Sequence, residues 1–140
     1  MPWGTVYYRA SNGTVPAQQF LLDCPISVRA KLLAVLEVVR AAPPPAFSGG
    51  GFWEAMHGSM NGYYEIRRIG PGRRHYRLYC ILDNGTEAEL AQRGFDSPQI
   101  AVINGLVKPN ATLFSGAEYA RHVRRLGDAY RATLPRPIAK

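Results

Sequence analysis

Cysteine, histidine and acidic residues are scarce in this chain of 140 residues, and each shortage excludes a class of function. Cys24 and Cys80 are too few for a disulfide framework, and neither they nor the three histidines have the spacing of a zinc site. We therefore expect neither a metal nor a cofactor. No stretch approaches the about 20 apolar residues of a membrane span, and the N-terminus has no signal-like pattern. We expect a soluble, cytoplasmic protein without a membrane partner.

The charges that are present are mostly positive. Seventeen Lys and Arg residues against ten Asp and Glu give a formal net charge of +7, and the sequence pI is about 9.8. With 46% hydrophobic residues the chain is long and apolar enough for one globular domain over residues 1–140. A small basic domain favours an acidic partner, which is nucleic acid, an anionic surface or an acidic protein.

The stretch from Gly62 to Leu82, GYYEIRRIGPGRRHYRLYCIL, predicts a β-hairpin. Gly70-Pro71-Gly72 at its centre suits a type II turn, in which proline takes the first central position and glycine the second. Side chains alternate between two faces of a strand. One predicted face is apolar and contains Tyr64, Ile66, Tyr76, Leu78 and Cys80. The other is polar and contains Tyr63, Glu65, Arg67, His75, Arg77 and Tyr79.

Two interpretations of this polar face remain open from the pattern alone. Arginine with tyrosine or histidine on one rigid face suits the binding of a nucleic-acid backbone with stacked bases. The alternative is a solvated face with ordinary cross-strand pairs, for example Glu65 with a neighbouring arginine.

The segment before the hairpin predicts a strand and two helices. WGTVYYR at 3–9 has the composition of a strand. Residues 15–23 predict a short helix, and a second helix begins at Pro25, because apolar residues recur every three or four positions. The prolines at 43–45 would end it. Residues 46–61 predict a loop that Phe52, Trp53 and Met56 fasten to the core, and its three consecutive glycines at 49–51 predict a flexible connector.

The segment after the hairpin predicts one strand and one long helix. Residues 83–99 form a polar connection with a helical turn at 87–92, and IAVINGLV at 100–107 indicates a central strand covered on both faces. Ser115 and Glu118 have the spacing of a capping box for a helix that runs to about Arg131.

A short, flexible, basic tail follows from about residue 133. The predicted order is β-α-α-β-β-β-α, an α+β fold. In it an N-terminal helical hairpin packs on a small, mostly antiparallel sheet, and a C-terminal helix closes the domain.

Four motifs in this order resemble the RelE/ParE toxin superfamily, specifically its HigB-like, phage-derived branch. VYYRASNGTVP is similar to the first strand and turn of that branch, and YEIR followed by YRLY to its paired sheet motif. INGLVKP resembles the last strand, and the capped helix resembles the C-terminal helix. The resemblance covers most of residues 6–131. It implies a RelE-like, microbial-RNase-like fold, cleavage of mRNA on the translating ribosome, and neutralisation by a small helix-turn-helix antitoxin.

The resemblance also assigns individual residues. Arg67 corresponds to the basic residue of the first sheet motif, Arg77 to that of the second, and Lys108 to the first lysine of a terminal pair. The chain departs from the family pattern twice, because Asn104 stands at the motif histidine and Pro109 at the second lysine.

A ribonuclease that uses the 2′-OH of its substrate needs a base, an acid and cations around the phosphate. We expect Arg67 and Arg77 to hold the phosphate and Lys108 to add charge. His75 and Glu65 are the acid–base candidates, and no metal is required. Further contacts to RNA are expected from Tyr63, Tyr79, Arg74 and Asn104.

Two other functions remain open beside the endoribonuclease toxin. Relatives of the ParE type poison DNA gyrase on the same fold, so fold alone does not select the activity. The two departures from the family pattern favour such a protein-binding inhibitor. The long 83–99 connection is compatible with a degenerate phage-derived domain that binds a partner without catalysis.

Overall fold

The computed structural model of the chain describes residues 2–42, 51–109 and 114–140. In chain order the main elements are β1 (Gly4–Tyr8), α1 (Pro16–Asp23), α2 (Ile26–Ala41), β2 (Trp53–Ala55), β3 (Tyr63–Ile69), β4 (His75–Asp83), α3 (Glu87–Gln92), β5 (Gln99–Lys108), α4 (Gly116–Tyr119), α5 (Arg125–Ala132) and β6 (Ile138–Ala139). The π-helical segment η4 (Ala120–Arg124) joins α4 to α5. We call these three pieces, residues 116–132, the C-terminal helix.

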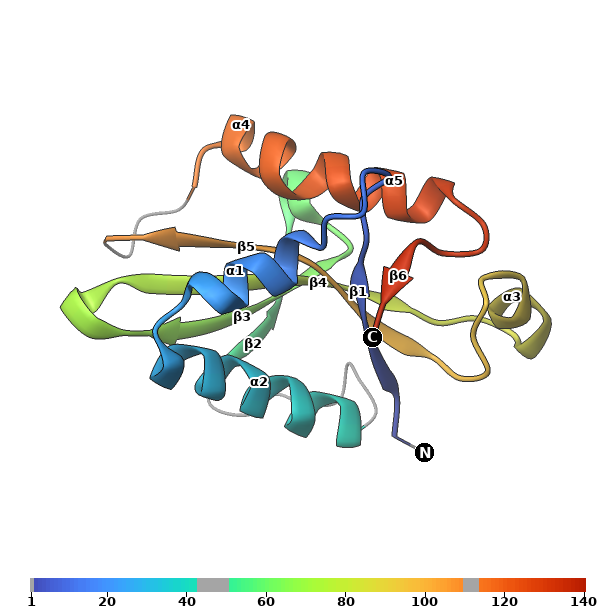
Figure 1. Cartoon of the computed structure of the whole chain (residues 1–140), viewed down its shortest axis with the longest axis horizontal. Helices are drawn as coiled ribbons and strands as arrows, with labels where there is room; N and C mark the ends of the chain where they lie inside the picture. Colours follow the sequence, from blue (N-terminus) through green and yellow to red (C-terminus); the bar gives the residue numbers. More distant parts are fainter. Residues whose placement is uncertain (1, 43–50, 110–113) are drawn as a thin grey trace.

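The strands form one mixed sheet in the order β2-β3-β4-β5-β1-β6. Among the described strands four pairings are antiparallel, and β1 runs parallel to β5. Helices cover both faces, with α1 and α2 on one side and the C-terminal helix on the other (Figure 1). The predicted α+β class is therefore confirmed. The order of elements differs from the predicted one, because β2, α3 and β6 are added to it.

The face under α1 and α2 is the apolar face that the hairpin pattern predicts. Its fully buried side chains come from both layers and include Val28, Leu32, Val39, Ile66, Leu78, Cys80, Ile100 and Val102. The 3.6-residue period of α2 brings its buried residues to one stripe on this side, namely Val28, Leu32, Val35, Leu36 and Val39.

Part of the opposite face is also a hydrophobic core. The C-terminal helix lays Tyr119, Val123 and Tyr130 on it, and Tyr63 and Tyr79 of the hairpin lie underneath them. The prediction that this hairpin face is polar throughout is wrong at these two tyrosines, because the apolar stripe of a distant helix covers them. The face becomes polar only towards the hairpin tip.

The predicted loop at 46–61 contains a short strand. There β2 pairs antiparallel with β3, and Trp53 is buried with its ring stacked on Tyr64 at 5.0 Å between centroids. Residues 43–50, with the predicted helix-ending prolines and most of the glycine run, lie outside the described residues. Burial of Trp53 gives this segment its place at the sheet edge.

The C-terminal residues are docked, not a free tail. β6 pairs with β1, and Arg136 Nε lies 3.0 Å from Asp83 Oδ2 at the end of β4. Asp83 is 4% exposed and also contacts Arg93 Nη1 at 2.7 Å and the Tyr130 hydroxyl at 2.6 Å. This buried network ties the end of the chain to α3 and to the C-terminal helix.

The turn, the capping box and the helical turn that the sequence predicts are all present in the structure. Gly72 has φ 70° and the Arg73 N–H donates to the Gly70 carbonyl at 3.1 Å, as the predicted turn requires. Ser115 and Glu118 form the predicted capping box, and the helical turn at Glu87–Gln92 is α3. Within the described part of the chain, no helix combines the length and apolar character needed to cross a membrane.

Candidate functional site

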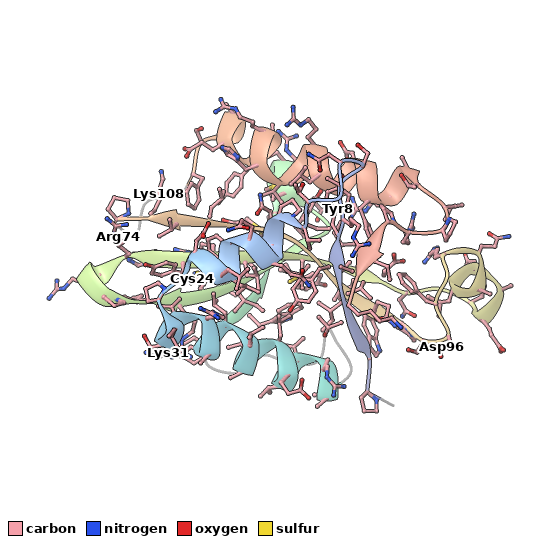
Figure 2. All side chains as sticks on the ribbon, viewed as in Figure 1. Tyr8, Cys24, Lys31, Arg74, Asp96 and Lys108 are labelled. Carbon is pink, nitrogen blue, oxygen red and sulfur yellow. The ribbon has the colours of Figure 1, made fainter. Side chains whose placement is uncertain are left out.

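The candidate site lies at the polar end of the hairpin. Four of its residues share one face of three adjacent strands, namely Arg67, His75, Arg77 and Lys108. Arg67 of β3 is the direct cross-strand partner of Arg77 of β4. His75, two residues before Arg77, pairs with Lys108 at the end of β5. Lys108 and Arg74 lie at the same end of the sheet, opposite Asp96 (Figure 2).

Glu65 is the centre of an ion-pair cluster on this face. Its Oε1 atom lies 3.2 Å from Arg77 Nη1 and 3.7 Å from Arg67 Nε. Arg67 also reaches across to β2, where its Nη2 atom lies 2.7 Å from Glu54 Oε1 and donates to the Gly51 carbonyl at 3.0 Å. Two arginines and two glutamates therefore hold one another in a fixed arrangement.

The four charged groups of this cluster differ in their exposure to solvent. Glu65 is 7% exposed and Arg77 is 8% exposed, whereas Arg67 and Glu54 are more accessible. Burial raises the pKa of Glu65, the arginines Arg77 and Arg67 act against that rise, and Glu54 adds to it. A carboxyl group with a raised pKa is a better proton acceptor than an ordinary glutamate.

An open cleft of about 410 Å³ lies beside this cluster at the hairpin tip. We call it the hairpin cleft. Its lining includes Phe52, Arg67, Arg68, Ile69, His75 and Arg77. The Arg68 guanidinium stacks over the Phe52 ring at 4.2 Å from its centroid, a cation–π contact that shapes the wall. The cleft therefore presents positive groups and one imidazole to solvent, and no carboxylate is among its lining residues.

A second hollow, of about 490 Å³, lies on the same face between β2 and the start of the C-terminal helix. We call it the helix hollow. Its lining includes Met56, His57, Ser59, Glu65, Phe114 and Tyr119. Glu65 thus borders the helix hollow while its carboxylate contacts the two arginines of the hairpin cleft.

The predicted catalytic residues come together to different degrees. Arg67, His75 and Arg77 line the hairpin cleft, and Glu65 contacts both arginines from the side of the helix hollow. Lys108 is one strand away, with its Nζ atom 3.9 Å from Glu118 Oε1 and 4.8 Å from the centroid of the Phe114 ring. Its charge stays at the rim of the site.

The residues predicted only as RNA contacts are placed differently. Arg74 is exposed at the hairpin tip. Tyr63 is 3% and Tyr79 0% exposed, so neither ring offers a face to a base. Asn104 donates through Nδ2 to the His122 carbonyl at 2.9 Å, inside the π-helical segment, and so fastens the C-terminal helix to β5.

Sequence reasoning missed Glu54, Phe114 and Tyr119 as members of the site. Glu54 lies in a segment predicted to be a loop, and only its position after Trp53 indicates a strand. Phe114 and Tyr119 reach the site because the C-terminal helix crosses the sheet, and no local pattern records that crossing.

Within residues 2–42, 51–109 and 114–140, no three His, Cys, Asp or Glu side chains converge in a way that could hold a metal ion. No protein-family model matches the chain, and no curated protein or solved structure matches it either. The chemistry of Glu65, His75 and the two arginines is therefore the basis for a functional assignment.

Proposed function

We propose that this chain is a metal-independent endoribonuclease, the toxin of a toxin–antitoxin pair, which cleaves mRNA on the translating ribosome. The proposal includes a RelE-like fold of the HigB-like type, extended by β2, α3 and β6. The observation that carries it is the Glu65–Arg67–Arg77 cluster with His75 on the same strand face, beside one open cleft. These side chains are a base, two phosphate ligands and an acid in one place.

In the proposed reaction the phosphodiester occupies the hairpin cleft. Glu65 accepts the proton of the 2′-OH, and the 2′ oxygen attacks the neighbouring phosphorus. Arg67 and Arg77 bind the non-bridging oxygens, whose negative charge increases in the transition state. His75, as imidazolium, gives its proton to the departing 5′ oxygen. The products are a 2′,3′-cyclic phosphate and a 5′-hydroxyl, and no further reactant is needed.

The ion pairs seen in the structure prepare this chemistry. Without substrate, Arg77 Nη1 donates to Glu65 Oε1 at 3.2 Å and Arg67 Nε lies 3.7 Å from the same oxygen, which keeps the cluster compact and oriented. A bound phosphate competes with Glu65 for the same guanidinium groups. As that contact weakens, the pKa of Glu65 rises further, because burial remains and the opposing charges are shared. Binding of the substrate therefore makes the base stronger.

Charge supports an RNA substrate over a neutral one. The four ion-paired groups Glu54, Glu65, Arg67 and Arg77 cancel in formal charge, and Lys108 pairs with Glu118, but Arg68 lines the cleft and Arg74 is exposed at the hairpin tip. Together with the net charge of +7, this favours approach of a polyanion. The ribosome and a helix-turn-helix antitoxin are the further partners that the proposal includes.

Binding without cleavage is the second candidate, in the manner of gyrase-directed relatives. The observation in its favour is Asn104, which stands at the motif histidine and is bonded to the C-terminal helix. It leaves His75 as the one imidazole that lines the hairpin cleft among the described residues.

Expression in a bacterium distinguishes the two. Wild type, Arg67→Ala and Arg121→Ala would be induced, with growth followed and a reporter mRNA mapped by primer extension. Arg121 is an exposed arginine of the C-terminal helix and serves as the matched control. We expect growth arrest and new cuts within translated codons for wild type and Arg121→Ala, and neither for Arg67→Ala. Arrest with intact mRNA would overturn the nuclease assignment and favour a protein target.

A further inference from the structure

The helix hollow and the hairpin cleft share no lining residue, but one ion pair joins their walls. Glu65 lines the hollow, and its Oε1 atom is 3.2 Å from Arg77 Nη1, which lines the hairpin cleft. A group in the hollow and a phosphate on Arg77 would therefore belong to the same nucleotide or to adjacent ones. The proposed reaction uses Glu65 but no other residue that lines the hollow.

The chemistry of the hollow differs from that of the cleft. Met56, Met60, Phe114 and Tyr119 make its wall thioether and aromatic, whereas the cleft is lined by cations. The Phe114 and Tyr119 rings meet edge to face at 5.8 Å, and Tyr119 meets Tyr79 in the same way at 5.8 Å. This perpendicular packing fixes the wall, because each ring is held by the next.

Polar side chains also line the hollow beside this apolar wall. His57 and Ser59 are exposed in and beside the 3-10 turn η2 (Gly58–Met60), and Glu65 lies at the border with the cleft. An apolar wall with a few placed polar groups, in a volume of about 490 Å³, is the usual form of a small-ligand site. A nucleobase fits that description, since its faces are apolar and its edge carries donors and acceptors.

We infer that the helix hollow is a nucleobase subsite, which holds the base next to the scissile phosphate and makes the enzyme selective for that base. The inference rests on the proposed ribonuclease function. The Glu65–Arg77 contact, which joins the wall of the hollow to that of the phosphate cleft, is the reason to assign a base and not a separate apolar ligand. Lys108, held over the Phe114 ring and beside Glu118, places positive charge at the rim, where the backbone would leave the site.

The first test is binding, followed by amide NMR shifts of the wild-type protein. Inorganic phosphate is expected to shift residues of the hairpin cleft alone. The four nucleoside 3′-monophosphates are expected to shift the cleft and also Met56, His57 and Tyr119, with one base giving the tightest binding. Nucleotides that shift the cleft only would overturn the base subsite and leave the ribonuclease proposal standing. Nucleotides and phosphate that shift neither would overturn both.

A filling variant provides the second test. Ser59→Phe would occupy the hollow, and we expect it to weaken binding of the preferred nucleotide by about tenfold or more, because the base would lose its contacts with the apolar wall. Its affinity for inorganic phosphate should not change. Ser27→Phe, at an exposed position of α2 under the other face of the sheet, is the matched control. Equal nucleotide affinity in Ser59→Phe and Ser27→Phe would contradict the inference.

Discussion

Replacing Arg77 by alanine tests the pair at the centre of the site, and the structure predicts that the change affects folding as well as activity. Glu65 and Arg77 are both nearly buried, with 3.2 Å between Oε1 and Nη1. Removing one partner of a buried ion pair costs about 3–5 kcal/mol, because the other charge stays buried. Arg67 Nε remains 3.7 Å from the carboxylate. We therefore expect the low end, about 3 kcal/mol, which lowers Tm by about 10 °C.

The pH dependence identifies the cause of this loss. The pKa of Glu65 is already raised by burial, and removal of Arg77 raises it further. A carboxyl group whose pKa is higher in the folded state than in the unfolded state stabilises the fold at low pH, and this stability is lost as pH rises through the folded pKa. The deficit of Arg77→Ala is therefore expected to grow from pH 5 to pH 7, while most of it disappears in Glu65→Gln/Arg77→Ala.

These differences are measured by chemical denaturation at pH 5 and pH 7. The proteins compared are wild type, Glu65→Gln, Arg77→Ala and the double variant. A deficit for Arg77→Ala below about 1 kcal/mol at pH 7, or one equal at both pH values, would refute the reasoning. So would a double variant that is no more stable than Arg77→Ala.

Three other changes have defined outcomes. Asp83→Asn should lower unfolding free energy by about 2–3 kcal/mol, since a buried charge with two arginine partners is lost, whereas the exposed Asp96→Asn should be neutral by the same denaturation assay. Gly127→Ala should destabilise by about 1–3 kcal/mol, because a Cβ there meets the Tyr63 hydroxyl, and Tyr63→Phe should relieve part of that loss in thermal melts. Treatment of the purified protein with a chelator, which is removed before ribosomes and mRNA are added, should leave the rate of mRNA cleavage unchanged in a gel assay, and a rate that falls after this treatment would exclude the metal-independent mechanism.

The central hairpin can be predicted from sequence because its information is local. Alternation from Gly62 to Leu82 fixes which side chains share a face, and this period alone is enough to place Arg67 and Arg77 together. The capping box of Ser115 and the apolar stripe of α2 are equally local signals. Each depends on a period or spacing within about one or two helical turns.

The rest of the site depends on contacts between distant segments. Tyr63 and Tyr79 have the same spacing as the functional residues of their strands, but the C-terminal helix covers them, and Gly127 permits its close approach to Tyr63. β2 is three residues long and exists only because β3 provides a partner. Asn104 matches a family position, yet its hydrogen bond to His122 is defined by a π-helical segment that the sequence does not signal.

The most direct test of the central claim is cleavage by purified protein of a defined mRNA on programmed ribosomes, with the chemistry of the new ends determined. Wild type should release a fragment ending in a 2′,3′-cyclic phosphate and one beginning with a 5′-hydroxyl, and folded Arg67→Ala should release neither. Equal cleavage by wild type and Arg67→Ala, or ends with a 5′-phosphate, would contradict the proposed site and its mechanism.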